Sequence, residues 1–334
     1  MIDQDQIAKE NRSKIRIMRW ILLLGSVLTI GKFVAWFLTH SNAVLTDALE
    51  SIINILAAAF GLFSLVYAAR PKDENHPYGH GKMEFLAVGF EGGLIFFAGG
   101  GMILKAVYNA YHPQHLEHLN TGIWITSLTA IANYFMGKFL IRKGKILQSS
   151  TLSADGIHLI SDTYSSIVLL AGLLVMQFSG AHWIDTGLTI VLGAYILVVG
   201  YRLLRNSLGG LMDEADFVKL AEVIEVLNKE RIDRWIDIHN LRVVKYGSSL
   251  HIDAHLSLPW YDDLQSTHEQ VKNLEKLINN HFGNRVELFI HTDPCIPVSC
   301  TVCMLHDCKV RQKEFVRKVE WTSMNLLKNQ PHSF

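Results

Sequence analysis

The sequence predicts an α-helical membrane protein with six transmembrane helices, followed by a small α+β domain. Residues from about 17 to 205 carry long apolar runs with few charges, whereas the rest of the 334-residue chain is charged and alternates polar with apolar side chains. A helix of about 20 apolar residues is long enough to cross a hydrocarbon core of about 30 Å. The predicted spans are 17–39, 43–68, 85–110, 121–140, 153–178 and 183–204.

Basic residues predict the orientation of these spans, because loops rich in Lys and Arg stay in the cytoplasm. Lys and Arg are frequent before the first span and in the loops that follow the second and fourth spans. The loops on the other side contain neither residue. Both termini are therefore expected in the cytoplasm, and the expected location is the inner (plasma) membrane of a bacterium.

After Met212 the composition changes to that of a soluble domain with the order αββαβ. Such a unit forms a sheet with its helices on one face. Its elements are predicted at 215–229, 238–246, 249–257, 264–282 and 285–291. The chain is thus divided into a cytoplasmic N-terminal segment, 1–16, a transmembrane domain, 17–211, a cytoplasmic α+β domain, 212–294, and a cysteine-rich tail, 295–334. Balanced charge, with 31 basic and 31 acidic side chains, gives no indication of nucleic-acid binding.

Two similar polar stretches lie 108 residues apart, in the second and fifth predicted spans. Each occupies the second position of a three-helix half, and an odd number of crossings inverts the second half relative to the first. Inverted repeats of this kind place a binding site at their interface. The stretches align Asp47 with Asp155, Glu50 with His158, and Asn54 with Asp162.

The last two polar residues of each stretch are four apart, so they share one helical face. Ionisable groups at bilayer depth cost about 3 kcal/mol each, so their presence indicates a function. Carboxylate, amide and imidazole ligands without sulfur suit zinc, iron(II), manganese or cobalt. The alternative is a polar cluster that joins helices by hydrogen bonds. The predicted metal cage consists of Glu50, Asn54, His158 and Asp162.

Three further acids accompany this cage. Asp47 and Asp155 lie one turn earlier and are expected to contact the ligands rather than the metal, with helix packing as the alternative. Glu91 lies two turns inside the third span, beside glycines that let helices approach closely. The sequence leaves its role open between proton carriage, auxiliary metal ligation and pairing within the bundle.

The loop between the second and third spans is a second candidate site. Asp73, His76 and His80 follow one another at short intervals and all have side chains that ligate divalent metals. A solvated polar turn is the alternative explanation of the same residues.

The soluble domain is rich in histidine. Residues two or four apart on a strand share a face, so His251, Asp253 and His255 can present together. Other histidines flank this strand in the sequence, and scattered surface histidines are the alternative explanation. The set expected at one sheet edge is His239, His251, His255, His268, His291 and Asp293.

Four cysteines follow in the order C-x4-C-x2-C-x4-C. Their number and the central C-x2-C are those of a structural zinc site. Thiols stay reduced in the cytoplasm, so a disulfide framework is not expected there. An iron–sulfur cluster and a redox pair remain open. These residues are Cys295, Cys300, Cys303 and Cys308.

Taken together, residues 10–295 resemble the cation diffusion facilitators. The most specific pieces are Arg70-Pro71, Gly79-His80-Gly81-Lys82 and the ending His291-Thr292-Asp293-Pro294. The resemblance implies a homodimeric exporter with a ferredoxin-like (metallochaperone-like) cytoplasmic domain. Such an exporter exchanges a cytoplasmic divalent metal, most often zinc, for protons.

The resemblance also assigns residues. It places the transport site on the four residues of the predicted cage and a loop site on Asp73, His76 and His80. It implies a charge interlock near the dimer interface between Lys82 and Asp213. It assigns a metal-responsive cytoplasmic site to His239, His255, His268, His291 and Asp293.

The chain departs from zinc-transporting members at two ligands. Those members usually have His or Asp in place of Glu50, and Asp in place of Asn54, whereas His158 has the zinc-like form. Zinc is therefore the expected substrate and regulatory ligand, with iron(II), manganese, cobalt and cadmium as alternatives. A membrane metalloenzyme is not expected because no His-Glu-x-x-His motif occurs in the chain. A further alternative is a metal sensor that is anchored in the membrane and does not transport metal.

Overall fold

The computed structural model describes residues 4–39, 42–111, 119–179, 182–283 and 285–334. These residues form two compact units, one built from Ala8–Met212 and the other containing Asp213–Phe334. The division falls where the sequence changes from apolar spans to a soluble domain.

The first unit contains the predicted bundle. Each predicted span lies within a helix, and several helices extend beyond the apolar run. Over the described residues, four helices are long and apolar enough to cross a membrane: α1, α2, α3 and α6. The long helices described are α1 (Gln4–Thr39), α2 (Asn42–Ala68), α3 (Met83–Tyr111), α4 (Leu119–Ile146), α5 (Ser150–Ser179) and α6 (His182–Leu211).

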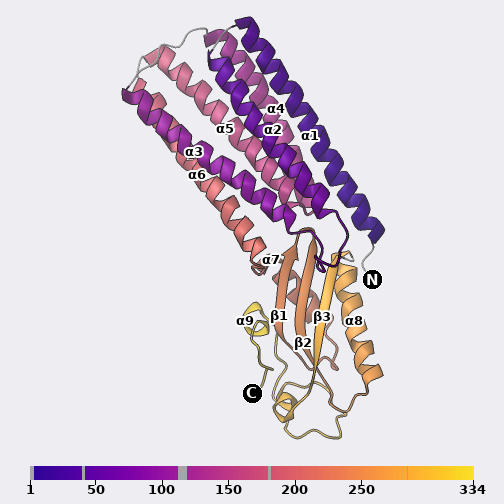
Figure 1. Ribbon diagram of the computed structural model, residues 1–334. Coiled ribbons are helices and arrows are strands. Elements are labelled where there is room, and N and C mark those ends of the chain that lie inside the picture. Colours follow the sequence, from indigo (N-terminus) through magenta and orange to yellow (C-terminus); the bar gives the residue numbers. More distant parts are fainter. Residues whose placement is uncertain (1–3, 40–41, 112–118, 180–181, 284) are drawn as a thin grey trace. The chain divides into compact units, whose positions relative to one another are not determined.

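Glycines bring these helices together in pairs, α3 with α6 and α4 with α5 (Figure 1). A methyl group added to Gly92 of α3 would lie 2.8 Å from the backbone nitrogen of Leu204 in α6. A methyl group added to Gly156 of α5 would lie 2.9 Å from the carbonyl oxygen of Gly137 in α4. Small residues therefore allow the backbones to touch, as is usual between membrane helices.

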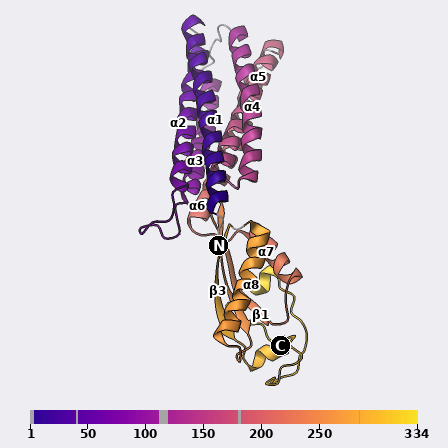
Figure 2. The same cartoon turned by 90° about the vertical axis from the view of Figure 1, so that its right-hand side faces the viewer.

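The second unit has the predicted αββαβ order. Within the described part of the chain the sheet has the order β1-β2-β3, with β1 antiparallel to β2 and β2 parallel to β3. Figure 2 shows the two helices of this αββαβ unit on the same side of the sheet. The elements are α7 (Phe217–Lys229), β1 (Asp237–Tyr246), β2 (Ser249–Leu258), α8 (Leu264–Phe282) and β3 (Val286–Pro294).

Local sequence signals set the ends of these elements. Asp216 caps α7 and Asp263 caps α8 with side-chain oxygens that accept backbone N–H groups. Gly283 ends α8 in the left-handed conformation, at φ 68°.

The segment after β3 packs into the same core as the sheet and helices. Val302, Trp321 and Leu326 are each at most 1% exposed and belong to that cluster. Two short elements lie in this segment, the 3-10 helix η1 (Pro297–Thr301) and the helix α9 (Ser323–Leu326).

Candidate metal sites

The intramembrane site brings α2 and α5 together through three polar side chains. Asn54 Nδ2 donates to Asp162 Oδ2 at 2.8 Å, and Asn54 Oδ1 lies 2.9 Å from His158 Nε2. His158 Nε2 is also 3.6 Å from Asp162 Oδ2. Three of the four predicted ligands are therefore in mutual contact. The fourth, Glu50, and the acid Asp47 have side chains outside the described part of the structure.

Glu91 of α3 faces the same histidine from the other side. Its Oε2 lies 3.3 Å from His158 Nδ1. Glu91 is 1% exposed, and among the described residues neither of its carboxylate oxygens has a hydrogen-bond partner. Asp155 is also buried and interacts electrostatically with Glu91 and His158. An acid buried without a hydrogen bond is costly, so Glu91 is suited to contact a cation or to take up a proton.

A cavity of about 60 Å³ adjoins these residues and is lined by Asn54, Asp155 and His158. Lys32 of α1 also lines it, is 9% exposed, and donates to Ser51 Oγ at 2.7 Å. The sequence motifs did not identify Lys32 as part of this site. The sequence did contain an indication, because Lys32 is a charged residue within an apolar span. Such residues are rare in membrane helices unless they have a function.

The structure brings the three residues of the candidate loop site together. Asp73 Oδ1 lies 2.9 Å from His76 Nδ1, and Asp73 Oδ2 lies 3.3 Å from His80 Nε2. One ligand atom from each of the three lies within 4.8 Å of the others, so they can hold one metal ion. Gly79, at φ 90°, adopts a conformation that favours glycine and positions His80. Desolvation acts to raise the pKa of Asp73, but hydrogen bonds from His76 outweigh it and lower that pKa.

The sheet site is a row of histidines across three strands. The register pairs His239 with His255, and His255 with His291. Asp293 joins them, with Oδ2 2.9 Å from His255 Nδ1 and 3.4 Å from His239 Nε2, and with Oδ1 3.3 Å from His291 Nε2. His239, His255 and Asp293 also meet the 4.8 Å criterion for a metal group.

Two histidines of the predicted set lie apart from this row. His251 Nδ1 lies 3.5 Å from Glu287 Oε2, and its ring contacts Tyr246 edge-on. His268 is exposed on α8 and is not one of the ligands that converge on Asp293 in the described chain. The register of the strands explains why His239, His255 and His291 lie side by side. Sequence spacing alone does not show that His255 joins this row and His251 does not.

Two family profiles match this chain. The profile described as the cation efflux transmembrane domain covers residues 18–212, and the one described as the cation efflux protein, cytoplasmic domain, covers residues 215–295. The chain belongs to the cation diffusion facilitator family of efflux transporters. The resemblance seen in the sequence is thereby confirmed.

Relatives span nearly the whole transporter. An uncharacterised transporter of Synechocystis is 31% identical over 277 residues, covering 82% of this chain and 89% of the relative. The cation-efflux pump FieF of Yersinia enterocolitica is 28% identical, covering 81% and 90%. Metal tolerance protein 2 of rice is 28% identical, covering 85% and 79%. These matches establish a multi-pass membrane protein that moves divalent metal cations.

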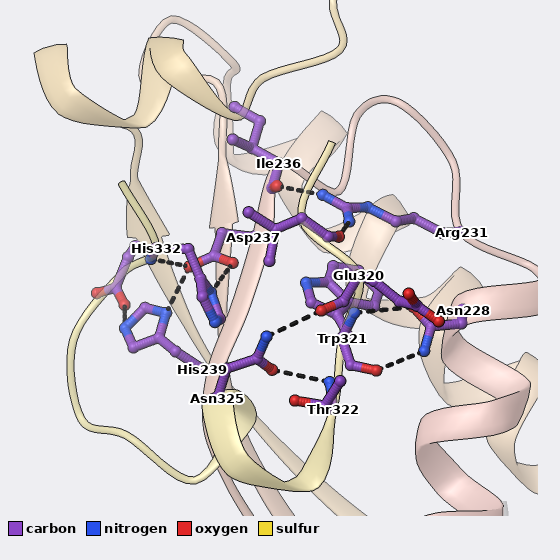
Figure 3. Close-up of polar contacts among 12 residues, drawn as sticks. Asn228, Arg231, Ile236, Asp237, His239, Glu320, Trp321, Thr322, Asn325 and His332 are labelled. Atoms are coloured by element: carbon purple, nitrogen blue, oxygen red, sulfur yellow. Dashed lines mark hydrogen bonds and ion pairs between the residues drawn. The ribbon is translucent and has the colours of Figure 1, made fainter. Parts of the chain in front are cut away.

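Beyond the family's cytoplasmic domain, the tail of this cation diffusion facilitator reaches the sheet site. His332 donates its backbone N–H to Asp237 Oδ2 at 2.9 Å, and its Nδ1 lies 2.6 Å from Asp237 Oδ1 (Figure 3). Asp237 Oδ2 is in turn 3.4 Å from His239 Nδ1. Burial acts to raise the pKa of Asp237, but His239 and His332 outweigh it and lower that pKa to about 2. Nothing in the sequence pattern connected His332 with His239.

The tail of the transporter is anchored by Trp321, which is 1% exposed. The Asn228 side chain donates to the Trp321 carbonyl at 2.7 Å and accepts its N–H at 3.1 Å (Figure 3). The Arg231 guanidinium lies 3.9 Å from the Trp321 ring centroid and donates to the carbonyl of Val319. These contacts bring His332 to its position beside the sheet.

The four tail cysteines of the transporter are free thiols. They line one cavity of about 40 Å³ together with Trp260 and Arg311. Desolvation raises the pKa of the Cys295 and Cys303 thiols.

The implied charge interlock of the transporter remains a prediction. Lys82 Nζ donates to the carbonyl of Leu211 at 3.3 Å. Asp213 adopts a left-handed backbone conformation, at φ 58°. The two residues belong to different compact units.

Proposed function

We propose that this transporter exports zinc from the cytoplasm in exchange for protons by alternating access. The observation that supports the proposal is the contact of Asn54, His158 and Asp162 between α2 and α5, with Glu91 facing the same imidazole. Imidazole and carboxylate ligands beside an amide oxygen suit zinc. Glu50 is proposed to complete the set. The transport is proposed to be secondary, that is, driven by the proton gradient.

Protons and metal compete at this site. Each ionisable ligand must lose its proton before it binds the cation, so metal binding releases protons. Imidazole changes its charge near physiological pH, which suits His158 to such an exchange. Glu91, buried with no hydrogen-bond partner among the described residues, is proposed to accept a proton that leaves the ligands.

The sheet site is proposed to sense cytoplasmic zinc. His239, His255, His291 and Asp293 converge on one edge, and the matched family domain supports a homodimer formed through this part of the chain. His268 is proposed to complete the site in that dimer. Zinc can shift the transporter between conformations to the extent that its affinity differs between them. Both termini are proposed to lie in the cytoplasm of a bacterial cell.

Sealed proteoliposomes test the transport proposal. Zinc uptake into vesicles should follow an imposed pH gradient and should collapse when the gradient is dissipated. His158→Ala and Asp162→Ala should abolish this flux while the protein stays folded by size-exclusion chromatography. His281→Ala, an exposed histidine on α8, is the matched control and should transport normally. Full flux in either ligand variant would refute the proposed site, and zinc binding without any flux would favour a sensor.

The same vesicles determine the metal. Zinc, iron(II), manganese, cobalt and cadmium should be compared in competition for one flux. We expect zinc to compete best, because His158 favours it over manganese. If iron(II) or manganese competes better than zinc, that metal is the substrate. The assignment of the transport-site residues would not change.

A further inference from the structure

All four cysteines of this chain gather around one small cavity at the end of the sheet. Cys295 follows β3, Cys300 lies in η1, and Cys303 and Cys308 lie in the turns beyond it. We propose that these thiols bind one thiophilic divalent ion of the zinc class, in a structural site separate from the histidine row. The inference does not depend on the transport proposal.

The backbone around the cavity is already fixed by Arg311. Its Nη1 donates to the carbonyl of Cys300 at 2.9 Å, and its Nη2 donates to those of Cys303 at 3.0 Å and Leu305 at 2.7 Å. One guanidinium thus holds three carbonyls of the segment that carries the central C-x2-C. A preformed backbone lowers the entropy lost when a metal binds. The positive charge of Arg311 also favours nearby thiolates.

The backbone N–H groups of Trp260 and Leu305 interact electrostatically with Cys295 and Cys303, respectively. The Tyr261 hydroxyl interacts with Cys308. Donors aimed at sulfur stabilise the thiolate, which is the form that ligates metal. They are the partners expected around a metal–thiolate centre.

The size of the cavity is sufficient for an ion. A water molecule needs about 10–15 Å³ of such space. The cavity, about 40 Å³, has room for an ion.

Metal binding requires the sulfur atoms to come closer together. Zinc–thiolate bonds of about 2.3 Å place tetrahedral sulfurs about 3.8 Å apart. The cysteines are not among the groups in the described chain whose ligand atoms lie within 4.8 Å of one another. The proposal requires the cysteine side chains to rotate about χ1 so that the four sulfurs meet. The ion would then join the end of β3 to the core residues Val302 and Cys303.

Thiol titration of the full-length protein tests the site directly. The chain has 4 cysteines, all in this segment, so a thiol reagent reports on nothing else. In protein purified with zinc present, we expect the thiols to react slowly, and chelation of zinc to expose all of them to rapid reaction. Rapid reaction before chelation would overturn the proposal.

Cobalt substitution identifies the ligands. Cobalt(II) added to the chelated protein should give thiolate-to-metal charge-transfer absorption with one equivalent per chain. Cys300→Ser and Cys303→Ser should each greatly reduce this band, whereas His306→Ala, in the same segment, should retain it. Asp293→Ala removes the histidine-row carboxylate and should also retain the band. Absence of the band in the unsubstituted protein, or bound iron with sulfide as isolated, would refute the zinc-class site.

Discussion

His332 Nδ1 lies 2.6 Å from Asp237 Oδ1, and the backbone N–H of His332 donates to the other oxygen of the same carboxylate. The side chain of Asp237 is 1% exposed, so this tail residue is a main partner of a buried acid. Asp237 faces His239, and His239 faces Asp293. The third residue from the end of the chain is therefore connected to the candidate zinc site by a line of polar contacts.

Replacement of His332 should weaken zinc binding at the sheet site. His332→Ala leaves Asp237 with one fewer donor, and Asp237 then holds the His239 imidazole less firmly. Loss of such an outer contact typically costs about 10–100-fold in metal affinity. Zinc titration against a chromophoric chelator, in a His158→Ala background that removes transport-site binding, measures this change.

The neighbouring Ser333→Ala variant is the control, because Ser333 is exposed in the same tail. Asp293→Ala provides the reference for complete loss of the site. Equal zinc affinity in His332→Ala and Ser333→Ala would show that the tail contributes nothing to the sheet site.

Asn54→Asp should tighten metal binding at the transport site and change its selectivity. Asn54 accepts at 2.9 Å from His158 and donates to Asp162 at 2.8 Å. The substitution exchanges a neutral oxygen for a charged one and removes the donor to Asp162, so two carboxylates then share one cation. Competition between zinc and manganese in proteoliposome flux measures the result. An unchanged order of metals would place Asn54 outside the ligand set.

Glu91→Gln should lower flux about tenfold or more and reduce its dependence on the pH gradient. Gln preserves the shape of the side chain but removes the charge 3.3 Å from His158 Nδ1. The matched control is Glu287→Gln, which alters an acid beside His251 in the sheet and should leave flux unchanged. Normal flux with normal pH dependence in Glu91→Gln would exclude Glu91 from the exchange.

Much of this architecture followed from sequence because its signals are local. Long apolar runs specified the spans, and period-two alternation specified the strands around His255 to within a few residues. The cluster of Asp73, His76 and His80 could be found because its residues are near neighbours in the chain. The pairing of Asn54 with Asp162, 108 residues apart, could be found because the two stretches resemble each other.

Other contacts required the structure because they join residues with no shared pattern. Lys32, Glu91 and His158 come from three helices, and no spacing rule connects them. His251 and His255 alternate equally well along β2, so their different partners are decided by which residues of β3 lie opposite. The tail histidine His332 reaches Asp237 through the anchoring of Trp321, a tertiary effect that periodicity does not encode.

A buried ion pair in the helical unit gives the last prediction. Lys14 Nζ of α1 lies 2.9 Å from Glu84 Oε1 of α3, and the Ser149 hydroxyl donates to Glu84 Oε2 at 2.6 Å. Both charged side chains are at most 3% exposed.

Glu84→Gln leaves the Lys14 ammonium buried without its counter-charge, which should cost about 3–5 kcal/mol of stability. Lys14→Met combined with Glu84→Gln removes both charges and should recover most of that loss. Thermal unfolding in detergent, followed by size-exclusion chromatography, measures both variants, and equal melting points for the single and double variants would contradict the role of this pair.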